Sequence, residues 1–438
     1  MLHHFIEQRD ETDARVAEGI ERNRKGQARV RVLDEKGRPV KGARVTAKQT
    51  GHDFQFGGSL NDLDQLGSEE KNRLFRERFR EVFNLGTIPI YWSALEPEEG
   101  KLRFAKDSPY IYRRPPLDLC LEFCEENGMT PKTHHLNYFQ RAHYPAWCPE
   151  TDLEKAKALC EKRFRELAER YAARIPQWEV INETLGSYII KDNPAIFYMP
   201  DSIEWSFALA EKYFPRNQLI INDDPPSTFG DQRGDRCTYY LQIERALGRG
   251  ARIDGIGLQS HLLYERDDPA LHDIQTDPSK LFATLDLYGK FGLPILITEV
   301  TLAIFSDLPE DEDIQAELLK ELYSLYFSHP AVQSVIFWDL ADGYTPGAGA
   351  GKMDEGWNIF RGSLLRYDMS EKPAYRMLRH LVKDVWHTEA SFVTDENGEG
   401  EWRGFYGDYA LEIGAGERSA VKTVSFPRNA RGGIVISL

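Results

Sequence analysis

Two glutamates, Glu183 and Glu299, each close an apolar run of the sequence. Glu183 follows Trp-Glu-Val-Ile-Asn, and Glu299 follows Ile-Leu-Ile-Thr. Two carboxyl groups, one protonated and one ionised, are what cleavage of a glycosidic bond through an oxocarbenium-like transition state requires. Either glutamate alone could equally well form a buried salt bridge. The two together favour a catalytic pair, because each follows a run whose end carries no other charge.

Further polar and aromatic residues close other apolar runs. They are His134, His135, Tyr138, Asn182, Asn222, Asp223, Asp224, Gln259, Ser260, His261, Trp338 and Asp339. The imidazoles and carboxylates among them could bind a metal ion. However, the sequence contains no His-x-His or His-Glu-x-x-His element, so we expect neither a catalytic metal nor another cofactor. Aromatic residues near run ends, such as Trp338 and Trp357, are typical of sites where sugar rings stack.

An alternation of strand-like and helix-like segments positions these residues. Longer amphipathic stretches such as 153–174 and 314–328 predict helices between short apolar runs. The runs expected to form strands are 54–60, 84–92, 130–138, 177–183, 218–224, 254–261, 294–300 and 332–340. Such an α/β alternation with eight units favours a closed (β/α)₈ TIM barrel, whose active site lies at the carboxyl ends of the strands. An open doubly wound sheet is the alternative, but the glycine-rich turn expected after its first strand is missing.

The two ends of the chain do not follow this alternation. Residues 27–53 alternate apolar and polar around a Gly-Arg-Pro turn, which predicts a β-hairpin, and residues 389–438 contain further alternating segments. Neither piece can bury a core alone, so we expect them to pair into a small β-rich accessory lobe beside a catalytic barrel at 54–388. Structural closure is the simpler role for this lobe, and glycan binding is the alternative. Residues 1–26 are expected to form a charged surface helix.

The composition narrows the classes of partner. The 438 residues include 70 acidic and 55 basic side chains, and the formal net charge of −15 disfavours nucleic acid and anionic membranes and favours a neutral glycan or small molecule. The first residues lack the apolar core of a secretory signal, and no stretch is apolar enough to cross a bilayer. Five cysteines, an odd number, favour free buried thiols. These features predict a cytoplasmic protein, or a secreted one if a leader has been removed.

The stretches WEVINET, GIGLQSHL, PILITEV, FWDLADG and SLLRYDMSEKPAY resemble glycoside hydrolase family 10, the family of endo-β-1,4-xylanases. The resemblance covers roughly residues 54–385. It implies a retaining hydrolase with Glu183 as acid/base and Glu299 as nucleophile. Asn182 would hydrogen-bond the 2-hydroxyl of the reacting sugar, and His261 would orient Glu299. The other residues that the resemblance places near the reacting sugar are His134, Gln259, Trp338 and Trp357.

Simple electrostatics supports these two roles. A hydrogen bond to a carboxylate keeps it ionised, which suits a nucleophile. Negative charge on Glu299 would raise the pKa of Glu183, which suits a proton donor. The mechanism predicts carboxyl groups about 5–5.5 Å apart and net retention of configuration.

The sequence also departs from the family pattern on the side of the non-reducing sugars, the glycone side. Residues 87–92 read Thr-Ile-Pro-Ile-Tyr-Trp where the family usually offers a Glu-Asn pair and a Lys before the Trp. Tyr138 and Phe139 replace a Trp-His pair, although we still expect Tyr138 to contact substrate. Asp224 replaces a Tyr. The missing groups would hold the distal sugar, so we expect a short or decorated oligosaccharide, or exo-type attack, instead of long plain xylan.

Three hypotheses follow. The first is a retaining hydrolase that cleaves β-xylosidic bonds in xylan or xylo-oligosaccharides. The second keeps the mechanism but acts on another β-glycan or a glycosylated small molecule. The third is a barrel that binds a glycan without cleaving it, which the presence of both Glu183 and Glu299 disfavours.

Overall fold

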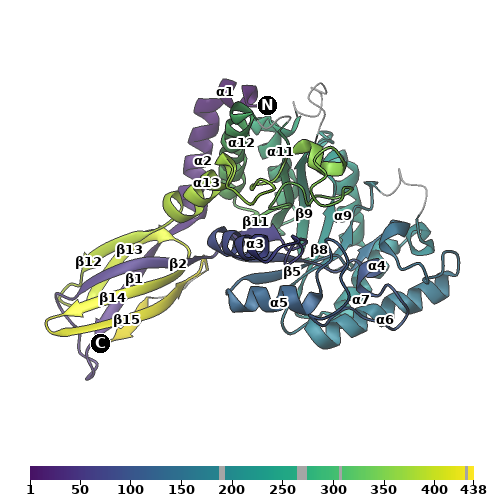
Figure 1. Ribbon diagram of the computed structural model, residues 1–438. Helices are drawn as coiled ribbons and strands as arrows, with labels where there is room; N and C mark the ends of the chain where they lie inside the picture. Colours follow the sequence, from purple (N-terminus) through teal and green to yellow (C-terminus); the bar gives the residue numbers. More distant parts are fainter. Residues whose placement is uncertain (187–192, 264–273, 305–307, 430–432) are drawn as a thin grey trace.

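The computed structural model describes residues 1–186, 193–263, 274–304, 308–429 and 433–438. Its larger part is a closed parallel barrel surrounded by helices (Figure 1). The strands are β3 (Gln55–Ser59), β4 (Leu85–Pro89), β5 (Thr130–His134), β6 (Asn137–Tyr138), β7 (Gln177–Asn182), β8 (Gln218–Asp223), β9 (Gly255–Leu262), β10 (Ile295–Leu302) and β11 (Val332–Phe337). Neighbours pair in parallel, β5 pairs with β7 to close the ring, and β5 and β6 together take the place of one strand. The expected TIM barrel is confirmed.

Each barrel strand is followed by a helix on the outside. The helices are α3 (Glu69–Val82), α5 (Leu117–Glu126), α6 (Leu153–Tyr171), α7 (Ser202–Tyr213), α9 (Thr238–Gly248), α11 (Pro278–Gly289), α12 (Pro309–Ser328) and α13 (Pro373–His380). Strands β7, β9 and β10 are buried at every position, because helices cover one face and the barrel interior covers the other. This two-sided burial explains why the strands appear in the sequence as apolar runs.

Two elements differ from their expected bounds. Helix α12 begins at Pro309, before the periodic run at 314–328, because proline at the first helical position and acidic residues in the first turn stabilise a helix start. Strand β4 ends at Pro89, and a short helix, α4 (Trp92–Leu95), replaces the end of the expected strand. Trp92 is therefore packed in the core and donates its indole N–H to Glu96 Oε2 at 3.1 Å.

The strands from the two ends of the chain form a sandwich of two sheets beside the barrel (left in Figure 1). One sheet has the order β13–β1–β16 and the other the order β12–β2–β14–β15. Their bounds are β1 (Lys25–Leu33), β2 (Arg44–His52), β12 (Glu389–Val393), β13 (Glu399–Phe405), β14 (Gly407–Ala415), β15 (Arg418–Phe426) and β16 (Ile434–Ser437). Alternate residues such as Val30, Val45 and Leu411 face inward and form an apolar core separate from that of the barrel. A β-rich lobe built from both ends is thus confirmed.

Strands β1 and β2 do not form the expected hairpin. β1 pairs with β13 and β16, whereas β2 pairs with β12 and β14 in the other sheet. A turn does follow β1, where the Asp34 N–H donates to Arg38 O at 2.8 Å, but the chain then crosses to the opposite sheet. An isolated two-stranded ribbon would leave its apolar face exposed to water, and placing the strands in facing sheets buries both faces.

The N-terminal segment forms two helices, α1 (His3–Glu7) and α2 (Arg9–Asn23). Helix α2 packs against α12, and Phe5 of α1 is buried in the barrel core. The charged segment is thus attached to the barrel through the buried Phe5, through the packing of α2 on α12, and through polar contacts such as that from Gln8 Nε2 to Asp277 Oδ1 at 3.0 Å. Within the described ranges, no helix combines the length and the apolar character that a membrane span needs.

Candidate active site

Glu183 directly follows β7 and sits in an unusual backbone conformation. Its φ of 49° lies in the left-handed region, which residues other than glycine rarely adopt unless their surroundings hold them there. The Glu183 N–H donates to Asn222 O of β8 at 3.0 Å. Beyond it, the Asp223 carboxylate accepts from Thr184 Oγ1 at 3.0 Å and from the Leu185 N–H at 3.2 Å. These contacts hold the strained residue at the carboxyl end of the barrel.

Tyr138, Gln259 and Asn182 are among the side chains that donate hydrogen bonds to the Glu183 carboxylate. The Tyr138 hydroxyl donates to Oε2, while Gln259 Nε2 and Asn182 Nδ2 donate to Oε1 at 2.9 and 3.3 Å. Burial and, after it, the charge of Glu299 raise the pKa of Glu183 to about 7, although the hydrogen bonds from Gln259 and Tyr138 lower it. At neutral pH the group can therefore both hold and release a proton, as an acid/base must.

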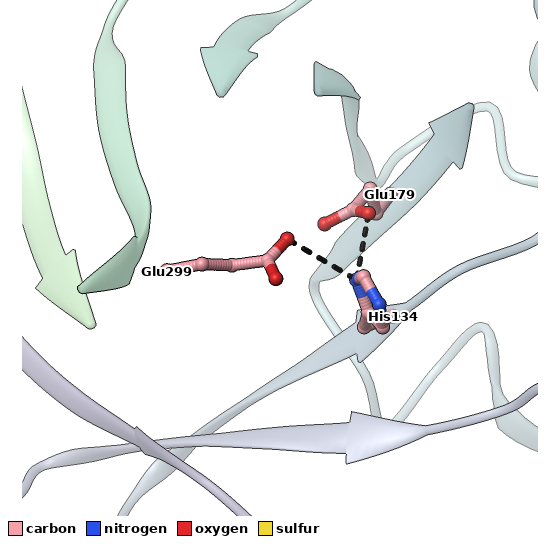
Figure 2. Close-up of side chains that lie close together, drawn as sticks. All are labelled: His134, Glu179 and Glu299. Carbon is pink, nitrogen blue, oxygen red and sulfur yellow. Dashed lines mark hydrogen bonds and ion pairs between the residues drawn. The ribbon is translucent and has the colours of Figure 1, made fainter. Parts of the chain in front are cut away.

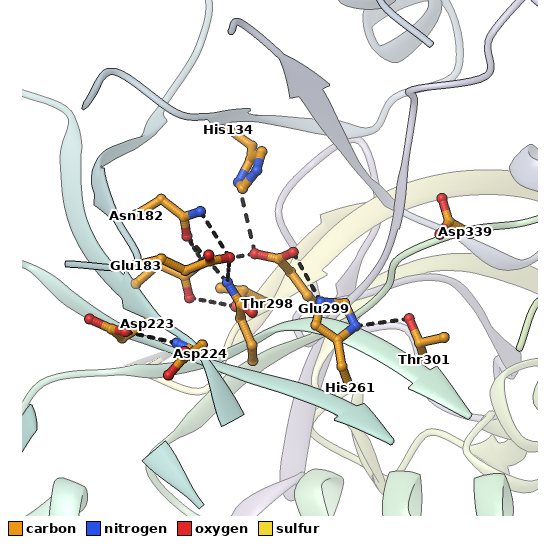
Figure 3. A network of polar contacts seen from close by, with 12 residues as sticks. His134, Asn182, Glu183, Asp223, Asp224, His261, Thr298, Glu299, Thr301 and Asp339 are labelled. Carbon is orange, nitrogen blue, oxygen red and sulfur yellow. Dashed lines mark hydrogen bonds and ion pairs between the residues drawn. The ribbon is translucent and has the colours of Figure 1, made fainter. Parts of the chain in front are cut away.

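Glu299 lies on β10, and its carboxylate faces that of Glu183 (Figure 3). Asn222 Nδ2 donates to Glu299 Oε1 at 2.9 Å, and His261 Nε2 donates to Oε2 at 3.3 Å. Burial nevertheless raises the pKa of Glu299 to about 7, with His134 opposing the rise. The hydrogen bond from Asn222 lowers the pKa of Glu299, in the direction expected from the sequence, but burial outweighs it. The two carboxyl groups titrate as an interacting pair.

Asn222 connects the surroundings of the two glutamates. Besides its bond to Glu299, its Nδ2 donates to Asn182 Oδ1 at 2.8 Å, and its Oδ1 accepts from Thr298 Oγ1 at 2.7 Å. A Cβ atom at Gly257 would lie 2.5 Å from Asn222 Oδ1, so the glycine in Gly-Ile-Gly-Leu-Gln-Ser-His leaves the space that this amide fills. Asn222 thus fixes the positions of Asn182 and Glu299 relative to each other.

His261 is held as a neutral donor to Glu299. Burial lowers the pKa of His261 to about 4. Its Nδ1 accepts from Thr301 Oγ1 at 2.9 Å, which leaves the proton on Nε2, where it is donated to Glu299 (Figure 3). The indole of Trp357 lies against the same imidazole, with ring centroids 5.0 Å apart. The His261 imidazole therefore contacts both the Glu299 carboxylate and the half-buried indole of Trp357.

His134 lies between Glu299 and a further buried carboxylate, Glu179 (Figure 2). Its Nδ1 donates to Glu179 Oε1 at 2.8 Å, and Lys132 Nζ donates to Glu179 Oε2 at 2.5 Å. Although burial raises the pKa of Glu179, the charges of Lys132 and His134 hold it at about 2. The opposite nitrogen of His134 lies 3.0 Å from the Tyr91 hydroxyl oxygen, within hydrogen-bond distance. A permanently ionised Glu179 keeps His134 oriented toward Glu299, whose Oε1 lies 3.9 Å away.

Ligand-type atoms of His134, Glu179 and Glu299 lie within 4.8 Å of one another, which is close enough to surround a metal ion. The Lys132 ammonium already neutralises Glu179 at this point, and both nitrogens of His134 have hydrogen-bond partners. The chemistry of these donors therefore fits an internal ion-pair network better than a cation site.

Aromatic rings form one wall of the site. The Trp338 ring lies 4.8 Å from that of His134, and Tyr138 stacks on His143 with ring centroids 4.2 Å apart. Tyr91 packs against His134 and His143 at 5.4 and 5.2 Å. All of these rings except His143 come from the strand ends, or the residues just after them, that the sequence indicated.

The structure brings the residues that sequence reasoning placed in the site together. Those with a contact to either glutamate or to His134 or His261 are Tyr138, Asn182, Gln259, Trp338 and Trp357. Gln259 donates to Glu183 and is also the register partner of Glu299 between β9 and β10. Sequence reasoning missed Lys132 and Glu179, whose only signal is one charge in each of two apolar runs. It named Asn222 at a strand end but gave it no role.

Comparison with known proteins relates this barrel to one family. A family model described as glycosyl hydrolase family 10 matches residues 45–380. Anti-sigma-I factor RsgI6 of Acetivibrio thermocellus is 24% identical over 399 residues, which cover 90% of this chain and 46% of that protein. Endo-1,4-beta-xylanase 1 of Arabidopsis thaliana is 25% identical over 379 residues, covering 85% of this chain and 34% of that protein. The chain thus spans less than half the length of either relative.

Solved structures share the fold. The crystal structure of native xylanase 10B from Thermotoga maritima has a TM-score of 0.57 and 22% sequence identity, and the similarity covers 76% of this chain and 96% of that one. At this identity the likeness concerns the barrel architecture.

Proposed function

The chain belongs to glycosyl hydrolase family 10, and we propose that it cleaves β-xylosidic bonds in xylan or xylo-oligosaccharides with net retention of configuration. The observation that carries the proposal is the facing pair of buried glutamates, Glu183 and Glu299, each with a pKa raised to about 7. Xylose is the proposed sugar because the Arabidopsis thaliana and Thermotoga maritima relatives carry the name xylanase.

In this mechanism Glu299 attacks the anomeric carbon while Glu183 gives its proton to the leaving oxygen. The ester that forms on Glu299 removes the negative charge that raised the pKa of Glu183. Glu183 then ionises more readily and can take a proton from the water that hydrolyses the ester. His261 and Asn222 position the carboxylate of Glu299 by donating to its two oxygens. Asn182, which donates to Glu183 Oε1, has the proposed role of hydrogen-bonding the 2-hydroxyl of the sugar.

Turnover of aryl β-xylosides tests the two roles separately. Glu299→Ala should abolish turnover of every substrate, because no glycosyl–enzyme can form. Glu183→Ala should slow substrates with poor leaving groups by about 10²- to 10⁴-fold, and activated aryl xylosides much less, because only poor leaving groups need the proton. The anomer formed first, read by proton NMR, should have the configuration of the substrate.

Glu417→Ala serves as the matched control, because that glutamate is exposed on the sandwich between β14 and β15. It should match the unmodified protein on every substrate. If the unmodified protein turns over no xyloside but still binds xylo-oligosaccharide, the barrel is a glycan-binding module. If it turns over other aryl β-glycosides instead, the mechanism stands and the sugar is wrong.

The glycone side supports a substrate other than long plain xylan. The segment that replaces the usual polar groups contributes Ile88 and Ile90, both fully buried in the core, and Tyr91, whose hydroxyl serves His134. None of these side chains offers a charged group to a distal sugar. We therefore propose a short or decorated oligosaccharide, tested by comparing initial rates on unbranched xylan, xylotriose and a branched xylotriose.

A further inference from the structure

The loop between α4 and α5 carries two adjacent arginines, Arg113 and Arg114, and places Arg114 against Tyr91, in the segment 87–92 that we assign to the glycone side. Arg103, buried within this loop, fixes its shape by donating to three backbone carbonyls. The acceptors are Ala94 O at 2.8 Å, Pro109 O at 2.9 Å and Arg114 O at 3.0 Å. The loop is thus tied together at its start, its middle and its end, so the two arginines that follow have defined positions.

The backbone turns the two side chains in different directions. Arg113 has a φ of 58°, a left-handed conformation that persists only where surrounding contacts hold it. Its guanidinium is buried and donates to Asp339 Oδ1 at 2.7 Å and to Asp62 Oδ1 at 3.2 Å. Arg113 is thus fully paired with two carboxylates and serves to hold the loop on the barrel.

Arg114 has no such partner. Its guanidinium lies over the ring of Tyr91, 3.7 Å from the centroid, and its Nη1 donates to Arg113 O at 2.8 Å. Within the part of the chain that the structure describes, no carboxylate lies within 4 Å of it. Tyr91 in turn touches His134, which faces Glu299. A half-buried cation with unused N–H donors is therefore separated from the nucleophile by two side chains, those of Tyr91 and His134.

The acidic surroundings of Arg114 indicate what kind of substrate group it could bind. The protein has a net charge of −15, and Glu183, Glu299, Asp223 and Asp224 gather at the barrel end. A substrate that carries a carboxylate would be repelled there unless a cation received it. An arginine supported on an aromatic ring binds a carboxylate with two parallel hydrogen bonds.

We propose that Arg114 is a specificity-determining residue that binds the carboxylate of a uronic acid unit on the glycone side of the substrate. The inference rests on the proposed function, since it describes which xylo-oligosaccharide the same site prefers. It gives the expected decorated substrate a chemical identity. It also explains how a barrel without the usual polar groups after β4 can hold a glycone, because one charged contact replaces several hydroxyl contacts.

A second role for Arg114 has to be separated from this one. Its charge also acts on the buried Asp62. Burial raises the pKa of Asp62 to about 7, although the charges of Arg113 and Arg114 lower it. If Arg114 only balanced that buried charge, its loss would weaken all substrates equally. A carboxylate receptor would instead change the preference between acidic and neutral substrates, so the test must compare a matched pair of ligands.

The experiment uses xylotriose and xylotriose that carries a glucuronic acid branch on its non-reducing unit. Affinities are measured by titration calorimetry in the Glu299→Gln background, so that binding is read without turnover, and kcat/KM is measured in the active protein. Arg114→Met keeps the apolar stem and removes the charge. We expect the acidic-to-neutral affinity ratio to fall about 10-fold or more, the range for a charged hydrogen bond lost at a half-buried site.

Arg418→Met, on the exposed sandwich strand β15, controls for the change in net charge and should keep the ratio of the unmodified protein. An unchanged ratio in Arg114→Met, or equal losses for both ligands, overturns the inference, as does failure of the acidic ligand to bind. Turnover without acidic preference leaves the proposed function intact and removes only the role of Arg114. If the acidic ligand is preferred in binding but no substrate is turned over, the role of Arg114 stands and the proposed catalytic function is wrong.

Discussion

At the scale of single residues, the pKa values of Glu183 and Glu299 determine how activity depends on pH. Glu299 must be ionised, so kcat/KM should rise as pH increases through its pKa of about 7. Glu183 must be protonated, so kcat/KM should fall as pH increases through its pKa, which is also about 7. Because the two charges repel each other, the protons leave in two separate steps, and the singly ionised form between them is active.

We therefore expect a bell-shaped profile of kcat/KM centred near neutral pH, measured on an aryl xyloside. An activity that stays constant from acidic to alkaline pH would mean that these groups do not titrate in the free enzyme. Glu183→Ala should lose the descending limb on an activated substrate, because that limb reports its proton.

Tyr138 offers a sharper test, because its hydroxyl donates to the ionised form of Glu183. That hydrogen bond lowers the pKa of Glu183, so Tyr138→Phe should raise the pKa and move the descending limb to higher pH. A hydrogen bond to a charged group is worth about 1.5–3 kcal/mol, which corresponds to a shift of about 1–2 pH units. The ascending limb should move little.

Tyr198→Phe is the comparison variant, since that side chain is 63% exposed and contacts neither glutamate. A Tyr138→Phe protein with a lower rate but an unmoved descending limb would show that the hydroxyl binds substrate instead. That result would return Tyr138 to the role expected from the sequence.

At the scale of elements, helix α6 fixes the interrupted barrel strand. Its buried Arg163 donates to the carbonyls of Leu136 and His135, in and beside the break between β5 and β6, and to Ile90 O after β4 at 2.6 Å. Both His134 and Tyr138 lie next to that break. One side chain on a helix thus supports two residues of the site.

Arg163→Met should remove the donors of three buried carbonyls. We expect a loss of about 2–4 kcal/mol in the free energy of unfolding, measured by urea denaturation, and a fall in kcat from displaced His134 and Tyr138. Arg165→Met, exposed on the same helix, should stay within about 0.5 kcal/mol of the unmodified protein. Equal stability of both variants would show that water can replace Arg163.

The elements also show which features a sequence can reveal. The barrel strands were predictable because burial on both faces leaves continuous apolar runs, and Glu183 and Glu299 were visible as charges at the ends of such runs. Glu179 was not, because its partner Lys132 lies on another strand, 47 residues away along the chain. Arg114 had no signal at all, since its loop has no periodicity. The hairpin prediction failed because local alternation does not specify which sheet a strand joins.

At the scale of the whole molecule, the sandwich and the barrel meet at Arg24, between α2 and β1. Its guanidinium donates to Phe327 O at 2.5 Å, His329 O at 2.6 Å and Val332 O at 2.8 Å, all near the start of β11. Its own carbonyl accepts from the Tyr406 N–H of the sandwich at 3.0 Å. This contact lies at the amino ends of the barrel strands, opposite the catalytic pair.

Arg24→Met should therefore lower the free energy of unfolding while leaving kcat nearly unchanged. Three buried carbonyls lose a shared donor, so we expect the free energy of unfolding to fall by about 2–4 kcal/mol and the sandwich to melt before the barrel. The kcat on an aryl xyloside should stay within about 2-fold below the first transition, because no contact of Arg24 reaches the strand ends that carry Glu183. Arg22→Met, exposed on α2, should change neither property. A single unshifted transition in Arg24→Met would show that the two parts are held together elsewhere, through the packing of α2 on α12.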